Sequence, residues 1–148
     1  MGWEDFLGAT HTDAALVMID GRIVYERYFD GMSAGDPHIL FSATKSYCGF
    51  LAELLAARGE LDFTRLIESY LPELAETGFA GASLRQIADM TDGARFSEVY
   101  TDPSSDACRY LAAMGLGPRD SASRPIGAYA ALQLLTEREN PPGEAFQY

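Results

Sequence analysis

The chain has 148 residues, of which 47% are hydrophobic and 22% charged, and its formal net charge is −11 at pH 7. This length and composition predict one globular domain with a core of its own and exclude a disordered chain. The negative charge argues against binding nucleic acid or an anionic membrane through a basic surface. No stretch reaches the roughly 18 apolar residues that cross a bilayer, so no membrane segment is predicted.

The first residues lack the basic and apolar regions of a signal peptide, which favours a cytoplasmic location. The two cysteines, Cys48 and Cys108, form no C-x-x-C pair, and the chain has two histidines. These are too few for a Cys/His cluster, so no metal site is predicted. Cys48 falls in an apolar helical stretch, where an inert, buried thiol is expected.

A β-hairpin is predicted near the N-terminus. Residues 14–19 are apolar and β-prone, and Asp20-Gly21 after them is a strong two-residue hairpin turn. Residues 22–29 alternate, with Ile23, Tyr25 and Arg27 on one face of the strand. A Gly/Ser/Asp-rich loop follows at 30–37. Because a lone hairpin is marginally stable, these strands should belong to a larger sheet whose other strands are not in this sequence.

Five helices are predicted after the hairpin. The first begins at about Thr44 and ends at Arg58-Gly59, where a cationic last turn meets a glycine stop. The remaining four are predicted at 66–71, ended by Pro72; at 83–90, opened by a Ser83/Gln86 capping box; from Ser104/Ser105 to Met114; and at 125–138, opened by proline. The predicted class is therefore α+β, with a sheet hairpin and loop at 1–43 and a helical part at 44–148.

The stretch Ser42-Ala43-Thr44-Lys45 carries the clearest chemical signal. On a helix, positions i and i+3 share one face, so the Ser42 hydroxyl and the Lys45 amine can meet. This pairing is the active-site seed of penicillin-recognising serine hydrolases. Lys45 is the chain's only lysine, and a randomly placed lysine would follow one of the ten serines at this spacing about one time in fifteen.

Several segments together resemble the serine β-lactamase/penicillin-binding-protein superfamily, in its class C and esterase-like branch. Within that branch the chain looks most like the 6-aminohexanoate-dimer (nylon oligomer) hydrolase type. The segments that carry the resemblance are Thr12–Ala14, Gly21–Tyr28, His38–Ser46, Gly59–Asp62, Tyr70–Leu74, Leu84–Ile87, Met90–Gly93, Phe96–Pro103 and Pro142–Tyr148. Members fold as a mainly antiparallel sheet beside an all-helical domain, so the resemblance implies a β-lactamase/transpeptidase-like fold.

The resemblance implies a role for four residues. Ser42 is the nucleophile, and Lys45 takes its proton or assists electrostatically, an alternative that stays open. Tyr148 matches the tyrosine that moves a proton to the leaving group. Tyr100 matches a tyrosine that contacts the substrate amide, and the alternative for it is an aromatic residue packed under a loop. The substrate is a small-molecule amide or ester, and no metal or organic cofactor is needed.

Other catalytic arrangements find less support in the sequence. His38 lies just before the predicted helix, and no second His/Asp arrangement accompanies it, so it is interpreted as a structural loop residue rather than part of a Ser-His-Asp triad. The carboxylates at predicted helical positions should face solvent, which argues against a glycosidase-type acid pair.

The chain is expected to be incomplete relative to this family, whose members run past twice its length. The strand that supplies the second oxyanion-hole N–H is missing, so these 148 residues are expected to be inactive by themselves. The alternative hypothesis is a non-catalytic penicillin-recognising or partner-binding module. An uncovered sheet edge would also favour self-association.

Overall fold

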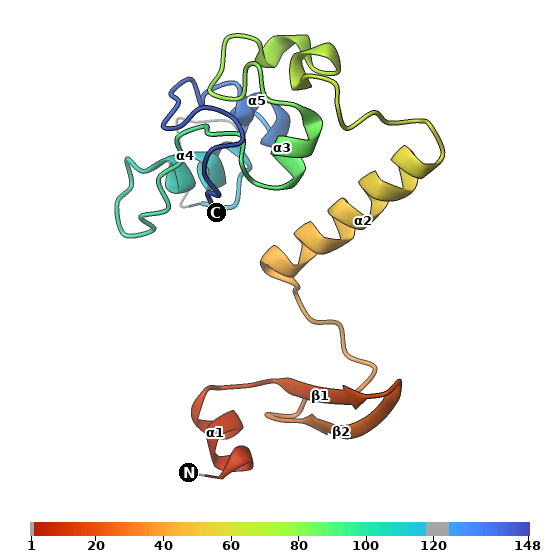
Figure 1. Ribbon diagram of the computed structural model, residues 1–148. Helices are drawn as coiled ribbons and strands as arrows, with labels where there is room; N and C mark the ends of the chain where they lie inside the picture. The colour runs from red at the N-terminus through yellow and green to blue at the C-terminus, as the bar shows by residue number, and fades with distance from the viewer. Residues whose placement is uncertain (1, 118–124) are drawn as a thin grey trace. The chain divides into compact units, whose positions relative to one another are not determined.

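The structure is a computed structural model that describes residues 2–117 and 125–148. The chain divides into two compact units, Met1–Thr44 and Lys45–Tyr148. Figure 1 shows the order of the elements along the chain. Among the described helices, none has both the length and the apolar character needed to cross a membrane.

The first unit is built on a two-stranded antiparallel hairpin of β1 (Ala14–Ile19) and β2 (Arg22–Tyr28). Both predicted strands and the predicted turn are confirmed. Asp20 and Gly21 adopt φ of 47° and 74°, and two positive φ values in a two-residue loop match the twist of the flanking strands. The pairing register shifts between Val17 and Met18. The regular alternation predicted along β2 is therefore interrupted by a bulge.

Helix α1 (Trp3–Ala9) precedes the hairpin and was not predicted. Its Glu4 carboxylate accepts a hydrogen bond from the Tyr25 hydroxyl (2.8 Å) and pairs with the Arg27 guanidinium (3.1 Å). The Trp3 ring meets the Tyr25 ring edge-on, with centroids 6.0 Å apart. These contacts hold the helix against the hairpin. Because the helix is short and is held by tertiary contacts, its sequence shows no helical periodicity of apolar residues.

Much of the hairpin's apolar surface remains exposed. The side chains concerned are Leu16, Val17, Met18, Ile19, Ile23 and Val24. An exposed apolar patch of this kind marks a surface that other chain segments or partners cover.

The first helix of the second unit is α2 (Thr44–Ala57), which belongs to this unit from Lys45 onward and confirms the first predicted helix. After it come α3 (Leu84–Ala88), α4 (Asp106–Ala113) and α5 (Ala128–Leu132). Cys48 on α2 is exposed, as are most apolar residues of this helix, so the prediction of a buried thiol was wrong. The pattern of apolar residues identified the helix correctly. It did not indicate which faces of the helix the rest of these 148 residues cover.

The helix predicted at 66–71 was wrong. A short 3₁₀ helix lies there instead, at Ile67–Ser69, and a second one follows at Pro72–Leu74. Leu66 pairs with Ser83 in an isolated β-bridge, and the Ile67 N–H donates to the Ala82 carbonyl (2.8 Å). The bridge holds Leu66 extended, with ψ of 145°, so the turn that follows begins at Ile67 and is only three residues long.

The helix predicted at 125–138 was too long at both ends. Gly127 has φ of 87° and serves as the N-cap, so the helix begins at Ala128. Beyond Leu132 the backbone pairs across the unit: the Leu135 carbonyl accepts from the Gly78 N–H (2.8 Å), and Ala94 bridges to Arg138. These bonds hold the chain extended where the apolar spacing alone predicted helix.

The capping box predicted for α3 is confirmed and gives a direct test of helix stability. The Ser83 hydroxyl accepts from the Gln86 N–H (3.2 Å), and the Gln86 side-chain oxygen accepts from the Ser83 N–H (2.8 Å). Ser83→Ala should lower the free energy of unfolding by about 1 kcal/mol. Urea unfolding followed by circular dichroism measures the change. Ser83→Thr is the control, because it keeps the accepting oxygen, and an equal loss in both variants would contradict the role of the cap.

Candidate functional site

Ser42 is the middle residue of a 3₁₀ turn at Phe41–Ala43, and it is exposed. Phe41 directly before it has φ of 43°, although a large side chain strongly disfavours this left-handed conformation. Non-glycine residues held in this region cluster at active sites and ligand clamps. The backbone of the proposed nucleophile turn is therefore strained, a feature that the sequence did not indicate.

Lys45 and Tyr148 contact each other within the second unit. Lys45 is the second residue of α2, and its Nζ lies 5.0 Å from the centroid of the Tyr148 ring. An ammonium within about 6 Å of a ring centroid is attracted by the negative face of the ring. The structure thus brings together two residues that are separated by more than a hundred positions along the chain.

Tyr148 is held in place by the residue before it. The Gln147 N–H donates to the Met90 carbonyl (2.9 Å), and the Gln147 side-chain amide donates to Glu139 (2.9 Å). The chain N-terminal to Tyr148 is anchored in the same way, since the Gly143 N–H donates to the Thr91 carbonyl (2.7 Å). Backbone pairing with residues 90–91 therefore positions Tyr148, the last residue of the chain, near Lys45.

Tyr100 also lies in the second unit. Its hydroxyl donates to the Glu98 carboxylate (3.0 Å), and the residue is 63% exposed. The hydrogen bond to Glu98 raises the pKa of Tyr100, partial burial and the Glu98 charge raise it further, and the charge of Tyr148 adds to the effect. Tyr100 is thus exposed and not buried under a loop.

Three of the four predicted residues, Lys45, Tyr100 and Tyr148, lie in the second unit, whereas Ser42 lies in the first. Ser42 and Lys45 are joined by two residues, across which the 3₁₀ turn leads into α2. Their association therefore still rests on the i, i+3 spacing, and their catalytic roles stay predictions.

His38 has a carboxylate partner, contrary to the prediction. Its Nε2 lies 2.9 Å from an Asp13 carboxylate oxygen, and its Nδ1 lies 2.8 Å from the Ile39 carbonyl oxygen. Each ring nitrogen therefore faces an oxygen of Asp13 or Ile39, an arrangement that differs from a triad, in which the second nitrogen faces the serine hydroxyl. Asp13 was not identified from the sequence as the partner of His38. The one feature that could have indicated it is its position immediately before a predicted strand.

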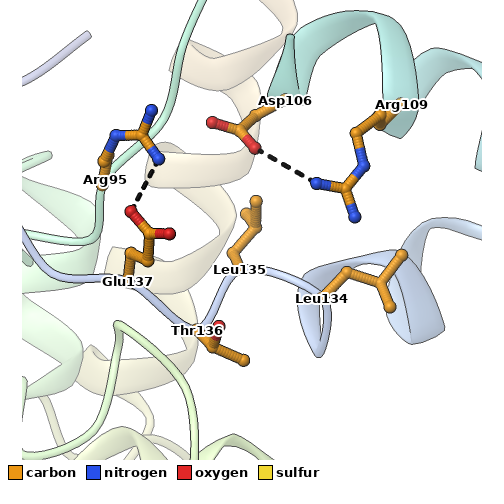
Figure 2. Close-up of a pocket in the computed structure, with 7 residues that line it drawn as sticks. All are labelled: Arg95, Asp106, Arg109, Leu134, Leu135, Thr136 and Glu137. Atoms are coloured by element: carbon orange, nitrogen blue, oxygen red, sulfur yellow. Dashed lines mark hydrogen bonds and ion pairs between the residues drawn. The ribbon is translucent and has the colours of Figure 1, made fainter. Parts of the chain in front are cut away.

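A small cavity of about 190 Å³ lies beside α4 and the segment after α5 (Figure 2). Two ion pairs line it, Arg95–Glu137 (2.7 Å) and the weaker Arg109–Asp106 (3.9 Å). The charges of the two pairs cancel, and the cavity contains none of the predicted site residues. In the described part of the chain, no group of three or more His, Cys, Asp or Glu side chains is arranged to hold a metal ion.

Comparison with known proteins adds three findings. The family model described as beta-lactamase matches residues 4–148. A 6-aminohexanoate-dimer hydrolase of Paenarthrobacter ureafaciens is 33% identical over 145 residues, which cover 98% of this chain and 36% of the relative. The solved structure named "Putative 6-aminohexanoate-dimer hydrolase from Bacillus anthracis" superposes with a TM-score of 0.85 at 29% identity, over 100% of this chain and 39% of that one.

These matches confirm the predicted β-lactamase-like fold, of which the chain contains a part. The chain spans little more than a third of the length of either relative.

Proposed function

This chain belongs to the beta-lactamase family. From this premise we propose that it is the part of a serine hydrolase that carries the nucleophile, and that the hydrolase acts on amide or ester bonds. The contact between Lys45 Nζ and the Tyr148 ring is the observation that carries the proposal. It joins two residues that the family motifs assign to proton transfer, and it does so between segments that are remote in sequence. The hydrolase names of the relatives support the same reaction class.

In the proposed reaction, Ser42 Oγ attacks the carbonyl carbon of the substrate. The hydroxyl proton passes to the Lys45 amine, directly or with Tyr148, and then to the departing amine or alcohol as the carbonyl–leaving-group bond breaks. The product is an acyl-serine, which water hydrolyses by the reverse sequence of proton transfers. No metal or organic cofactor takes part in these steps.

We propose a linear amide as the first substrate class to test, because the relatives are named for an amide-linked dimer. The test is hydrolysis of 6-aminohexanoate dimer, a nitrophenyl ester and a penicillin by the protein at its natural full length. Turnover of the amide or ester supports the proposal. Binding of penicillin without turnover of any substrate would instead support a non-catalytic penicillin-recognising module.

We further propose that residues 1–148 by themselves carry only part of the catalytic machinery. Their coverage of 36% of the relative's length supports this, as does the exposed apolar surface of the hairpin. Acyl transfer needs donors that stabilise the developing oxyanion, and losing one such donor costs about 10²–10³ in rate. The isolated 148-residue chain should therefore turn over no substrate under conditions in which the natural full-length protein does.

Replacement of Lys45 tests its proposed role in proton transfer. Lys45→Met should slow acylation by about 10²–10⁴, the usual contribution of a positioned acid or base. The initial burst of nitrophenol from an ester substrate measures this step. Lys45→Arg separates the two roles left open for the lysine: an arginine keeps the positive charge but cannot act as a base. An unchanged burst rate in Lys45→Met would contradict both roles.

A further inference from the structure

The His38 ring lies between two oxygen acceptors. The Asp13 carboxylate oxygen is 2.9 Å from Nε2, and the Ile39 carbonyl oxygen is 2.8 Å from Nδ1. A carbonyl oxygen and an ionised carboxylate can only accept hydrogen bonds, whereas a neutral imidazole has only one N–H. Both contacts are satisfied together only by the imidazolium, which donates from both nitrogens.

These two bonds connect the hairpin to the segment before Ser42. Asp13 is fixed on the hairpin, since its carbonyl accepts from the Phe29 N–H (2.9 Å) and so extends the pairing of β1 and β2. At the other end, Ile39 directly precedes Leu40, whose carbonyl accepts from the Ala43 N–H (3.0 Å) in the 3₁₀ turn. All of these residues belong to the first unit.

The segment that His38 holds leads into the strained conformation at Phe41. A left-handed φ at a large residue persists only where the surrounding structure enforces it. Within the described residues of the first unit, the hydrogen bonds shown for positions 37–39 are those of the His38 ring. The His38 ring therefore holds the backbone of the segment that leads to Ser42.

We propose that His38, as an imidazolium bound to Asp13 and to the Ile39 carbonyl, is a positioning residue that ties the nucleophile turn to the hairpin. The proposal rests on the proposed role of Ser42. It makes the order of the turn depend on pH, because loss of one ring proton removes one of the two bonds.

The charges around the ring support this dependence. The hydrogen bond to Asp13 raises the pKa of His38 above its usual 6.5, and the bond to Ile39 and the Asp13 charge add to this, whereas partial burial opposes it. The nearest charged residue along the chain is engaged elsewhere, because the Asp36 carboxylate accepts from the Ser33 N–H and hydroxyl. Because the folded pKa is raised, the two-bond form is complete below pH 6.5 and is lost as the pH rises through the folded value.

The first test follows His38 directly in the 148-residue chain. A titration by ¹H–¹³C NMR should give a His38 midpoint above 6.5, and Asp13→Asn should move that midpoint to lower pH. His11→Gln removes the chain's other histidine and so assigns the two ring signals. A His38 midpoint at or below 6.5, or one unmoved by Asp13→Asn, overturns the proposal.

Hydrogen exchange of the Ile39–Ala43 amides tests the positioning effect. After correction for the intrinsic pH dependence of exchange, their protection should fall as His38 deprotonates. His38→Gln, with one donor group and no charge, should give low protection at every pH. The change should be at most about fivefold, the scale of a half-exposed ion pair. Protection that is independent of pH in the unmodified chain would contradict the proposal.

The last test uses the natural full-length protein and the rate of Ser42 labelling by a fluorophosphonate. His38→Gln should remove an inflection from the pH profile of labelling, whereas His11→Gln should keep it. Labelling with an unchanged profile in His38→Gln overturns the positioning role and leaves the proposed hydrolase function standing. Failure of all labelling with normal titration and exchange results instead counts against the proposed function alone.

Discussion

Ser42→Ala should abolish covalent labelling of the natural full-length protein by a fluorophosphonate and reduce amide or ester hydrolysis to background. Removing the nucleophile of a serine hydrolase costs about 10⁶ in kcat, because the acyl-enzyme route is lost entirely. Labelling followed by mass spectrometric mapping of the modified peptide measures the effect. The unmodified protein should carry the label on Ser42.

Ser46→Ala is the matched control for this experiment. Ser46 comes four positions after Ser42 in the sequence, on α2, and it is also exposed. Its removal should leave labelling within about twofold, since it shares neither the spacing to Lys45 nor the strained turn. If Ser46→Ala lost the label and Ser42→Ala kept it, the nucleophile would be Ser46, and the proposed mechanism would be contradicted.

Gly93→Ala should destabilise the second unit strongly. Gly93 has φ of 80°, and a Cβ at this position would lie 1.9 Å from the Asn140 carbonyl oxygen, a backbone atom. The left-handed conformation costs a non-glycine residue about 1–2 kcal/mol, and overpacking adds about 1–3 kcal/mol. The free energy of unfolding should therefore fall by about 2–5 kcal/mol, measured from urea unfolding of the 148-residue chain.

Gly59→Ala separates the two contributions. Gly59 has a similar φ of 73°, but a Cβ there would meet nothing within 4 Å. It should therefore show only the conformational cost of about 1–2 kcal/mol. Equal unfolding midpoints for the two variants would contradict a steric conflict at Gly93.

The close approach at Gly93 also has a consequence for the candidate site. The Gly93 carbonyl accepts from the N–H groups of Glu139 and Asn140, and this pairing leads along the chain to Gln147 and Tyr148. Forcing the two segments apart should move Tyr148 away from Lys45. Protection of the Gln147 amide from exchange should accordingly fall in Gly93→Ala and stay near its original value in Gly59→Ala.

The sequence alone was sufficient where a structural feature depends on neighbouring residues. Asp20-Gly21 supplies the left-handed turn of the hairpin, and Ser83 with Gln86 supplies the capping box of α3. The Ser42-x-x-Lys45 spacing and the ordered family segments likewise pointed to the beta-lactamase family, which the comparisons confirm. Turn and cap preferences act over a few residues, so they can be predicted from the residues themselves.

The tertiary structure decided the features in which distant backbone groups compete for the same hydrogen bonds. Pairing of residues 78 and 94 with 135–138 ended α5 early, although the apolar spacing continued. The same kind of pairing placed Tyr148 beside Lys45, and the fold brought Asp13 to His38 across 25 positions. Such partners share no local pattern, because a hydrogen bond between remote segments depends on how the whole chain folds and not on spacing along it.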